Sequence, residues 1–595
     1  MNSKSTWNWI FVAAALFAFI FFYERHIRKP LPGPVLILPE LKDAAIGALQ
    51  VSPAGQLEIR AILTNGVWKL TRPVAYPAQS LAIESLLYKL ETLAPAAQIG
   101  VRELRDRPQF DQEFGFDQPQ FSIIVENNGR NTQILVGKTT APGDQVYLQV
   151  VGVESVYVVD AELLRFLPVS GDEWRDTTLL DLRTISFDQI NVRSGDLTIT
   201  FQQNPTNNAW RMTHPLQARA DSIRLLERLQ MLQTLQVSQF VTDDPSADLE
   251  LYGLQPPELE LSFDKGTNRV TALRFGKTPT NDTALIYAKR DGIASVVTVS
   301  AGPVAPWRAR VDDMRDRHFV TFDHEIGAFE FRGENNFDIQ RSSNAWKIVQ
   351  ETFPVDILMM NDFVVTLGAM QITQFKDAVT AADLESFGLA SPSRTIKLIS
   401  ARAASGTLTN EFLLLSFGLV DGVNVYARRS DEDAVYTVRL EDFVQLPDAA
   451  WQLRERRLWN FNEDAVARLI IKQNGKTREL IRHGTNSWSF APGSQGVINE
   501  FAVEEAANRF GELAVTQWVA RGNEYREPYG IGSQDHSITL VLKNGQRASV
   551  EFGRMAPTRY PYAATMLDGE TWVFEFPFAL YQLVNSYLSI PADVP

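Results

Sequence analysis

The sequence contains no cysteine, which excludes disulfide bonds, thiolate metal sites and cysteine nucleophiles. Histidine is also scarce: His26, His214, His318, His324, His483 and His536 are scattered, and none are spaced like helical ligand pairs. The P-loop, G-x-G-x-x-G, H-E-x-x-H and G-x-S-x-G patterns are missing as well. We therefore expect no catalytic residues, no metal ligands and no cofactor, and predict that the protein is not an enzyme.

Excess positive charge is missing too. The net charge is −14, and the first 29 residues carry +3, so the rest of the chain carries −17. Nucleic-acid binding needs clustered Lys and Arg to neutralise phosphates. The composition therefore argues against a nucleic-acid partner.

One uncharged apolar segment stands near the start of the chain. Residues Trp7–Tyr23 contain a single polar residue, Asn8, and aromatic rings lie at both ends, as expected at membrane interfaces. A cleaved signal peptide is the alternative, but no small-x-small cleavage site follows. We predict a tail at 1–6, a transmembrane anchor at 7–23 that binds the lipid bilayer, and a proline-containing linker at 24–34.

The side on which the body lies is ambiguous. Positive residues flank the anchor on both sides, and more follow it, so the positive-inside bias alone would place the body in the cytoplasm. Short N-terminal anchors of bacterial envelope proteins commonly send the body outward, and we favour that orientation.

Three landmarks recur four times along the remainder. A tryptophan follows a turn, an aromatic-glycine-apolar phrase precedes a strand-like run, and a strand ends in glycine. The tryptophans are Trp68, Trp210, Trp346 and Trp488; the phrase glycines are Gly115, Gly253, Gly388 and Gly530; the strand glycines are Gly137, Gly276, Gly418 and Gly553. Their spacings lie between 135 and 142 residues, which indicates a repeated unit of domain size.

Each unit reads as α+β: strands, a tryptophan strand, an amphipathic helix, the glycine phrase and further strands. We predict four tandem α+β domains in an elongated array, at residues 35–182, 183–320, 321–458 and 459–595. In the second unit, Asp221 or Ser222 suits a helix N-terminus, and Ile223, Leu226, Leu229 and Leu232 would form the buried face.

The repeated residues have structural and functional interpretations. A phrase glycine suits a positive φ between helix and strand, although a ligand loop is the alternative. A repeated tryptophan suits a buried anchor between helix and sheet, although an exposed one would suit sugar stacking. The charged stretches 310–318 and 454–457 between units suggest ion pairs that orient neighbouring domains.

Together the landmarks resemble a bacterial domain family of unknown function. In unit two they are Asn208–Met212, Asp221–Leu232, Tyr252–Pro256, Arg274–Lys277 and Tyr287–Val299. Members of that family are membrane-anchored envelope proteins encoded beside gliding-motility-type ABC transporters. The resemblance implies four tandem copies, an inner-membrane location with the body in the periplasm, and ABC transporter subunits as partners. It supplies no catalytic residues.

Three functions follow as hypotheses. The first is a non-enzymatic accessory or scaffold subunit of such a transporter complex. The second is a glycan- or peptidoglycan-binding module, which a cluster of exposed tryptophans would support. The third is an envelope hydrolase, which would need two converging acids in one cleft.

Overall fold

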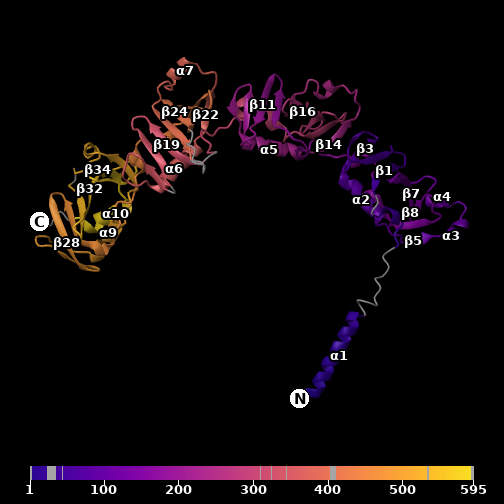
Figure 1. The fold of residues 1–595 in the computed structure, drawn as a ribbon, viewed down its shortest axis with the longest axis horizontal. Helices are drawn as coiled ribbons and strands as arrows, with labels where there is room; N and C mark the ends of the chain where they lie inside the picture. The colour runs from indigo at the N-terminus through magenta and orange to yellow at the C-terminus, as the bar shows by residue number, and fades with distance from the viewer. Residues whose placement is uncertain are drawn as a thin grey trace. The chain divides into compact units, whose positions relative to one another are not determined.

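A computed structural model of the protein describes residues 3–22, 35–42, 45–308, 310–322, 325–342, 345–401, 411–532 and 535–590. The chain is an α+β protein with four antiparallel sheets in sequence, and it divides into two compact units, Met1–Arg315 and Asp316–Pro595 (Figure 1). Each unit contains two sheets. We call the sheets with their helices domains 1 to 4.

Domain 1 has a nine-stranded sheet in the order β4-β3-β2-β1-β6-β7-β8-β9-β5. The strands are β1 Ile46–Pro53, β2 Ile59–Thr64, β3 Val67–Arg72, β4 Tyr76–Pro77, β5 Ala97–Ile99, β6 Phe121–Asn127, β7 Arg130–Thr139, β8 Gln145–Val150 and β9 Val156–Asp160. Helix α2 (Ser80–Glu91) packs Ile83, Leu86 and Leu90 into the core on one face of the sheet. Short helices α3 (Val101–Arg105) and α4 (Phe110–Phe114) follow β5.

Domain 2 repeats this topology with the order β13-β12-β11-β10-β15-β16-β17-β18-β14. Its strands are β10 Gln189–Ser194, β11 Leu197–Gln203, β12 Trp210–His214, β13 Ala218–Arg219, β14 Val237–Thr242, β15 Leu259–Lys265, β16 Asn268–Phe275, β17 Leu285–Arg290 and β18 Val296–Ser300. In both domains the helix follows the strand at one edge of the sheet, and the chain then forms the strand at the opposite edge.

Domains 3 and 4 have eight-stranded sheets, in the orders β21-β20-β19-β23-β24-β25-β26-β22 and β29-β28-β27-β31-β32-β33-β34-β30. The strands of domain 3 are β19 Ile326–Arg332, β20 Phe337–Ser342, β21 Ala345–Ile348, β22 Ile372–Lys376, β23 Arg394–Ser400, β24 Glu411–Asp421, β25 Asn424–Arg429 and β26 Val435–Arg439. Those of domain 4 are β27 Val466–Gln473, β28 Lys476–Gly484, β29 Ser487–Phe490, β30 Gln517–Arg521, β31 Ser537–Leu542, β32 Arg547–Met555, β33 Pro561–Leu567 and β34 Glu570–Glu575. Their helices are α6 Ile357–Ala369, α7 Ala381–Ser386, α8 Leu440–Phe443, α9 Glu500–Gly511 and α10 Phe578–Leu583.

The helix of domain 2 confirms one prediction and corrects another. Helix α5 (Ser222–Gln233) is capped by the Asp221 carboxylate, which accepts a hydrogen bond from the Arg224 N–H at 3.0 Å. The predicted buried face is half wrong, because Ile223 and Leu226 are exposed whereas Leu229 and Leu232 are buried. The buried stripe is completed by Leu225, since a helix of 3.6 residues per turn buries positions four and seven apart and not a strict period of three.

The predicted transmembrane anchor overlaps helix α1 (Ser3–Phe22), and Tyr23 lies outside the described residues. Within the described part of the chain, no helix combines the length and the apolar character that crossing a membrane requires. The first turn of α1 contains Ser3, Lys4, Ser5 and Thr6, which shortens its apolar part below the ~20 residues typical of a span. The linker predicted at 24–34 lies outside the described residues.

Candidate functional site: the glycine turns, the joints and the polar face

In all four domains the turn that contains the phrase glycine packs against the strand glycine. Gly115, Gly253, Gly388 and Gly530 have φ between 67 and 81°, which confirms the predicted left-handed turn. A Cβ on Gly276 would lie 2.0 Å from the carbonyl oxygen of Tyr252, directly before Gly253, and the other three strand glycines have the same contact at 2.1–2.3 Å. The two sets of glycines therefore let this turn pack directly on the sheet.

An aromatic pair holds the same turn. The ring before the phrase glycine packs on a tyrosine of the neighbouring strand, with ring centroids 4.5–5.0 Å apart. The pairs are Phe114–Tyr147, Tyr252–Tyr287, Phe387–Tyr426 and Tyr529–Tyr562. The turn packs on the sheet with its own backbone and ring, so the structural interpretation accounts for the aromatic residue and the glycine of the phrase.

The repeated tryptophans lie inside the domains. Trp68, Trp210 and Trp488 are buried in the cores, and Trp346 is half-buried against the core of its domain. The Trp488 indole N–H donates to Glu504 of α9 at 2.8 Å, which ties strand to helix. Among the described residues after α1, no tryptophan is exposed, so the surface that would favour sugar stacking is not found there.

An arginine occupies the joint between domains 1 and 2. Arg175 pairs with Ala78 of domain 1 in an antiparallel bridge, and Thr178 pairs with Gln236 of domain 2. The Arg175 side chain is 3% exposed and donates twice to the Asp243 carboxylate, at 2.6 and 3.0 Å. Its guanidinium also lies 4.4 Å from the ring centre of Phe240, in β14. Arg175 thus holds the two domains together, because its backbone pairs with domain 1 and its side chain contacts a carboxylate and an aromatic ring of domain 2.

The groups around Arg175 keep its partner, the Asp243 carboxylate, ionised. Burial alone would raise the pKa of Asp243, but the hydrogen bonds from Arg175 and from Ser295 (2.6 Å) lower it below the ordinary value. Burial raises the pKa of Tyr76, whose ring lies 5.3 Å from the Arg175 guanidinium, to about 12. The carboxylate is therefore charged and the phenol neutral at physiological pH.

The joint between domains 3 and 4 uses the equivalent arginine, Arg454. It pairs with Val355, and Arg457 pairs with Ala514, which repeats both bridges of the first joint. The guanidinium lies 4.2 Å from the ring centre of Trp572, and the Arg454 carbonyl accepts a hydrogen bond from the Trp518 indole at 3.0 Å. Its nearest carboxylate, Asp568, is 3.5 Å away.

Two further ion pairs reinforce this second joint. Arg521 of domain 4 donates to Glu351 of domain 3 at 2.6 Å, and Arg456 donates to Asp356 at 2.7 Å. The ion pairs predicted for the 454–457 stretch are therefore present, whereas the aromatic partners of the arginine were missed. Those partners lie 64 to 118 residues away in the sequence, beyond any local pattern.

The signal that could have revealed the joints is a constant distance. Arg175, Arg315 and Arg454 each follow the last residue of β9, β18 or β26 by 15 residues. Arg315 forms the same bridge, to Ala220, within its unit. An arginine at a fixed distance after the last strand of each of three domains predicts a shared role.

The following domain also has a repeated position, counted from the carbonyl that accepts a hydrogen bond from the entering chain. Five residues after the carbonyl that accepts the entering chain's N–H stand Phe240, Phe375 and Trp518. Phe240 lies beneath Arg175 and Trp518 beneath Arg454, whereas the arginine over Phe375 is Arg317, at 5.4 Å. In domain 1 the same position, five residues after Leu93, is Gln98. The aromatic ring is therefore shared by domains 2 to 4 and is replaced by an amide in domain 1.

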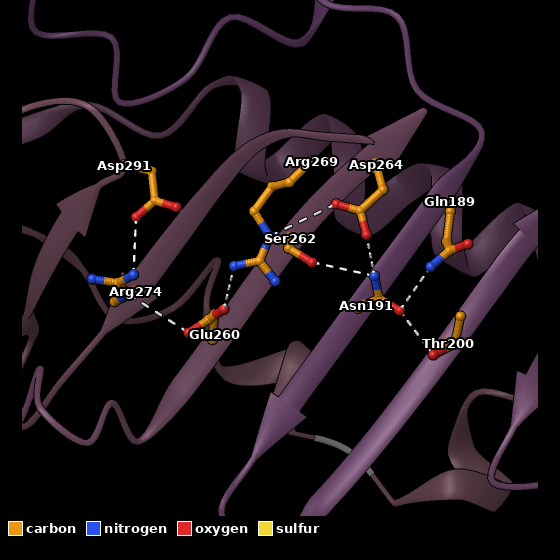
Figure 2. Close-up of polar contacts among 9 residues, drawn as sticks. All are labelled: Gln189, Asn191, Thr200, Glu260, Ser262, Asp264, Arg269, Arg274 and Asp291. Carbon is orange, nitrogen blue, oxygen red and sulfur yellow. Dashed lines mark hydrogen bonds and ion pairs between the residues drawn. The ribbon is translucent and has the colours of Figure 1, made fainter. Parts of the chain in front are cut away.

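The second face of the domain 2 sheet carries a network of polar side chains (Figure 2). Asn191 donates to Asp264 (2.6 Å) and Ser262 (3.2 Å) and accepts from Thr200 (2.8 Å) and Gln189 (3.2 Å), which satisfies its whole amide. A hollow of about 430 Å³ lies over this face.

Beside Asn191, charges of alternating sign run across β15 and β16. Glu260 lies 3.2 Å from Arg269 and 3.6 Å from Arg274, while Arg274 also pairs with Asp291 at 3.2 Å (Figure 2). Arg269 lies 3.9 Å from Asp264 as well. Glu260 and Asp264 are thus both paired with Arg269.

The histidines lie apart. His26 and His324 fall outside the described residues, His214, His318 and His483 are exposed, and His536 is buried beside Phe552. Across the described ranges, no group of three or more His, Asp or Glu side chains could hold a metal ion.

Comparisons with known proteins identify the repeated unit and nothing beyond it. No curated protein and no solved structure matches the chain. A family profile described as a domain of unknown function (DUF4340) matches residues 68–209, 210–375 and 346–530. Each match begins at a repeated tryptophan and contains one of the three arginines Arg175, Arg315 and Arg454. Since the matches cover more than half of the chain, the protein belongs to the DUF4340 family.

Proposed function

We propose that the protein is a non-enzymatic, membrane-attached envelope protein that serves as an accessory or scaffold subunit of a gliding-motility-type ABC transporter complex. The domains would form an extended array in the periplasm, attached to the inner membrane through α1. The partners would be the membrane and ATPase subunits of the transporter.

The observation that carries the proposal is the repeated joint. Flexibly linked binding modules need only a loose tether, but here an arginine, buried at Arg175 and half-buried at Arg454, and two backbone bridges fix one domain on the next within each unit. Joints that fix neighbouring domains on each other suit a protein that holds its partners at set positions. The polar face of domain 2, whose charges are paired with one another, suits the same role.

The membrane attachment rests on α1. Trp7, Trp9, Phe11, Phe17 and Phe19 are all exposed on this helix, and a run of large apolar side chains in water is unfavourable. Insertion of the helix into lipid or into a membrane partner would remove these side chains from water.

The test is affinity purification of the full-length protein from gently solubilised native membranes, with mass spectrometry of the proteins that accompany it. We expect the membrane and ATPase subunits of an ABC transporter in near-stoichiometric amounts. A matched control replaces Phe11, Phe17 and Phe19 with Ser, which should release the protein into the soluble fraction. Recovery of the protein alone, from membranes where the transporter is intact, would overturn the proposal.

A further inference from the structure

A core position of the domain 3 sheet is occupied by an arginine. Arg394 begins β23 and lies on the same face of that strand as the buried Ile396. Each sheet has an equivalent residue, which lies opposite the residue directly before the strand glycine. In domains 1 and 2 it is Phe121 and Leu259, both buried, and in domain 4 it is the buried His536. Domain 3 therefore places a permanent charge where domains 1 and 2 place an apolar side chain.

The Arg394 guanidinium lacks a carboxylate partner among the described residues. It donates a hydrogen bond to the Leu446 carbonyl oxygen at 3.2 Å and lies 4.6 Å from the ring centre of Phe443. Burial lowers the pKa of Arg394, and the neighbouring Asp448 carboxylate opposes this shift only in part. A half-buried cation whose one hydrogen-bond partner is a neutral carbonyl gains stability when an anion joins it.

A cavity of about 210 Å³ lies beside Arg394. Its apolar lining includes the rings of Phe331, Phe337 and Phe443. The first two are buried and stack on each other with ring centres 4.3 Å apart, so this wall is well packed. The volume is below the ~300–1,000 Å³ of sites for drug-sized ligands, which limits the occupant to a small molecule.

Two acids line the same cavity. Glu334 lies in the turn between β19 and β20, and Asp448 lies in the segment after α8; both residues are exposed. Neither carboxylate forms an ion pair or accepts a hydrogen bond within the described part of the chain. The turn packs on the start of β23, since a Cβ on Gly333 would lie 2.9 Å from the Ser393 carbonyl oxygen. The cavity is thus lined by a cation that lacks an anion and by anions that lack a cation.

We propose that this cavity binds a small zwitterion, namely an amino acid with an apolar side chain. Arg394 binds the carboxylate of the ligand, Asp448 accepts hydrogen bonds from its ammonium group, and the phenylalanine rings contact its side chain. A simple anion is disfavoured by the two carboxylates of the lining, and a simple cation is disfavoured by Arg394. The site is independent of any attachment to a transporter, so either proposal can fail alone.

The first test measures hydrogen exchange of the full-length protein in mild detergent, with leucine and phenylalanine as probes. We expect protection of peptides that contain the β19–β20 turn and residues 443–448, with a Kd of about 1 mM or lower. Two leucine analogues with a single charge, 4-methylpentanoate and 3-methylbutylamine, should bind at least about tenfold more weakly. Absence of protection by both amino acids, or binding of either analogue as tight as that of leucine, would overturn the inference.

The second test assigns the two charges to residues. Arg394→Leu introduces the residue that domain 2 has at this position, so domain 3 should remain folded. This variant should weaken leucine binding at least about tenfold without weakening the binding of 3-methylbutylamine. Asp448→Asn should weaken leucine binding without weakening the binding of 4-methylpentanoate.

The matched control is Arg341→Leu, which removes an arginine of β20 that pairs with Glu325 and does not line the cavity. It should leave the binding of all four probes unchanged. Leucine binding that survives Arg394→Leu, or an equal loss in the control, would contradict the assignment.

Discussion

The two joints that lie within the units have the same backbone pairing, but different side chains surround the arginine. At the first, a carboxylate receives Arg175 in two hydrogen bonds and the aromatic rings are secondary. At the second, three aromatic rings surround Arg454, and the carboxylate of Asp568 is 75% exposed. The comparison teaches that the strand pairing fixes where the arginine lies, while the side chains that receive it can change.

The largest expected difference concerns the rings. Trp572 is buried and contributes both to the core and to the arginine site, so Trp572→Ala should destabilise domain 4 by about 3–5 kcal/mol. Phe240→Ala, at a half-buried ring, should cost about 2 kcal/mol in domain 2. Hydrogen exchange of peptides from β34 and β14 measures the two locally. Equal losses would mean that the rings are equivalent and would break the comparison.

For the arginines, we expect the larger loss of stability at the first joint. Arg175→Met leaves the Asp243 carboxylate without its main partner and should cost about 3 kcal/mol. Arg454→Met keeps an apolar chain among apolar rings and should cost about 1 kcal/mol. Hydrogen exchange across each joint measures both, and Arg175→Lys controls for charge without the paired hydrogen bonds. A larger loss for Arg454→Met would reverse the assignment.

Lowering the pH should change the stability of the two units by different amounts. Burial lowers the pKa of His536 in domain 4, so the folded state favours the neutral ring. That stability is present above the ordinary pKa of about 6.5 and is lost as pH falls toward the folded value, by at most about 1.4 kcal/mol per pH unit. The lowered pKa of Asp243 acts in the same direction, but only below about pH 4.

Between pH 7 and pH 5 we therefore expect domain 4 to lose stability while the Arg175 joint stays unchanged. Hydrogen exchange at both pH values, corrected for the intrinsic rate, makes the measurement. His536→Gln should remove the loss in domain 4, and a loss that persists in this variant would assign it to another group.

The smallest effect is expected at the exposed carboxylate of the second joint. Asp568→Asn should change the stability of domain 4 by less than about 1 kcal/mol, because an exposed ion pair is screened by water and salt. Urea unfolding followed by hydrogen exchange of β30 checks this. A loss as large as that of Arg175→Met would show that both joints depend on a carboxylate.

The sequence predicts the repeat, the left-handed glycines and the Asp221 cap because each depends on neighbours in the chain. It does not predict which side of α5 is buried, since Ile223, Leu225, Leu226 and Leu229 are all apolar and only the packed sheet selects among them. The surroundings of Arg454 escape prediction for a related reason. Phe353 and Trp572 come from different domains and meet only when both have folded.

The bounds of the family matches do not coincide with the bounds of the sheets, which matters for the expression of single repeats. A fragment cut at 68 and 209 would begin at β3 and end after β11, so it would lack β1 and β2 of the first sheet and β12 to β18 of the second. Unpaired strand edges on both sides would expose backbone groups and promote aggregation. Soluble expression of single repeats therefore requires cuts between complete sheets, near the joint arginines, where one sheet has ended and the next has not begun.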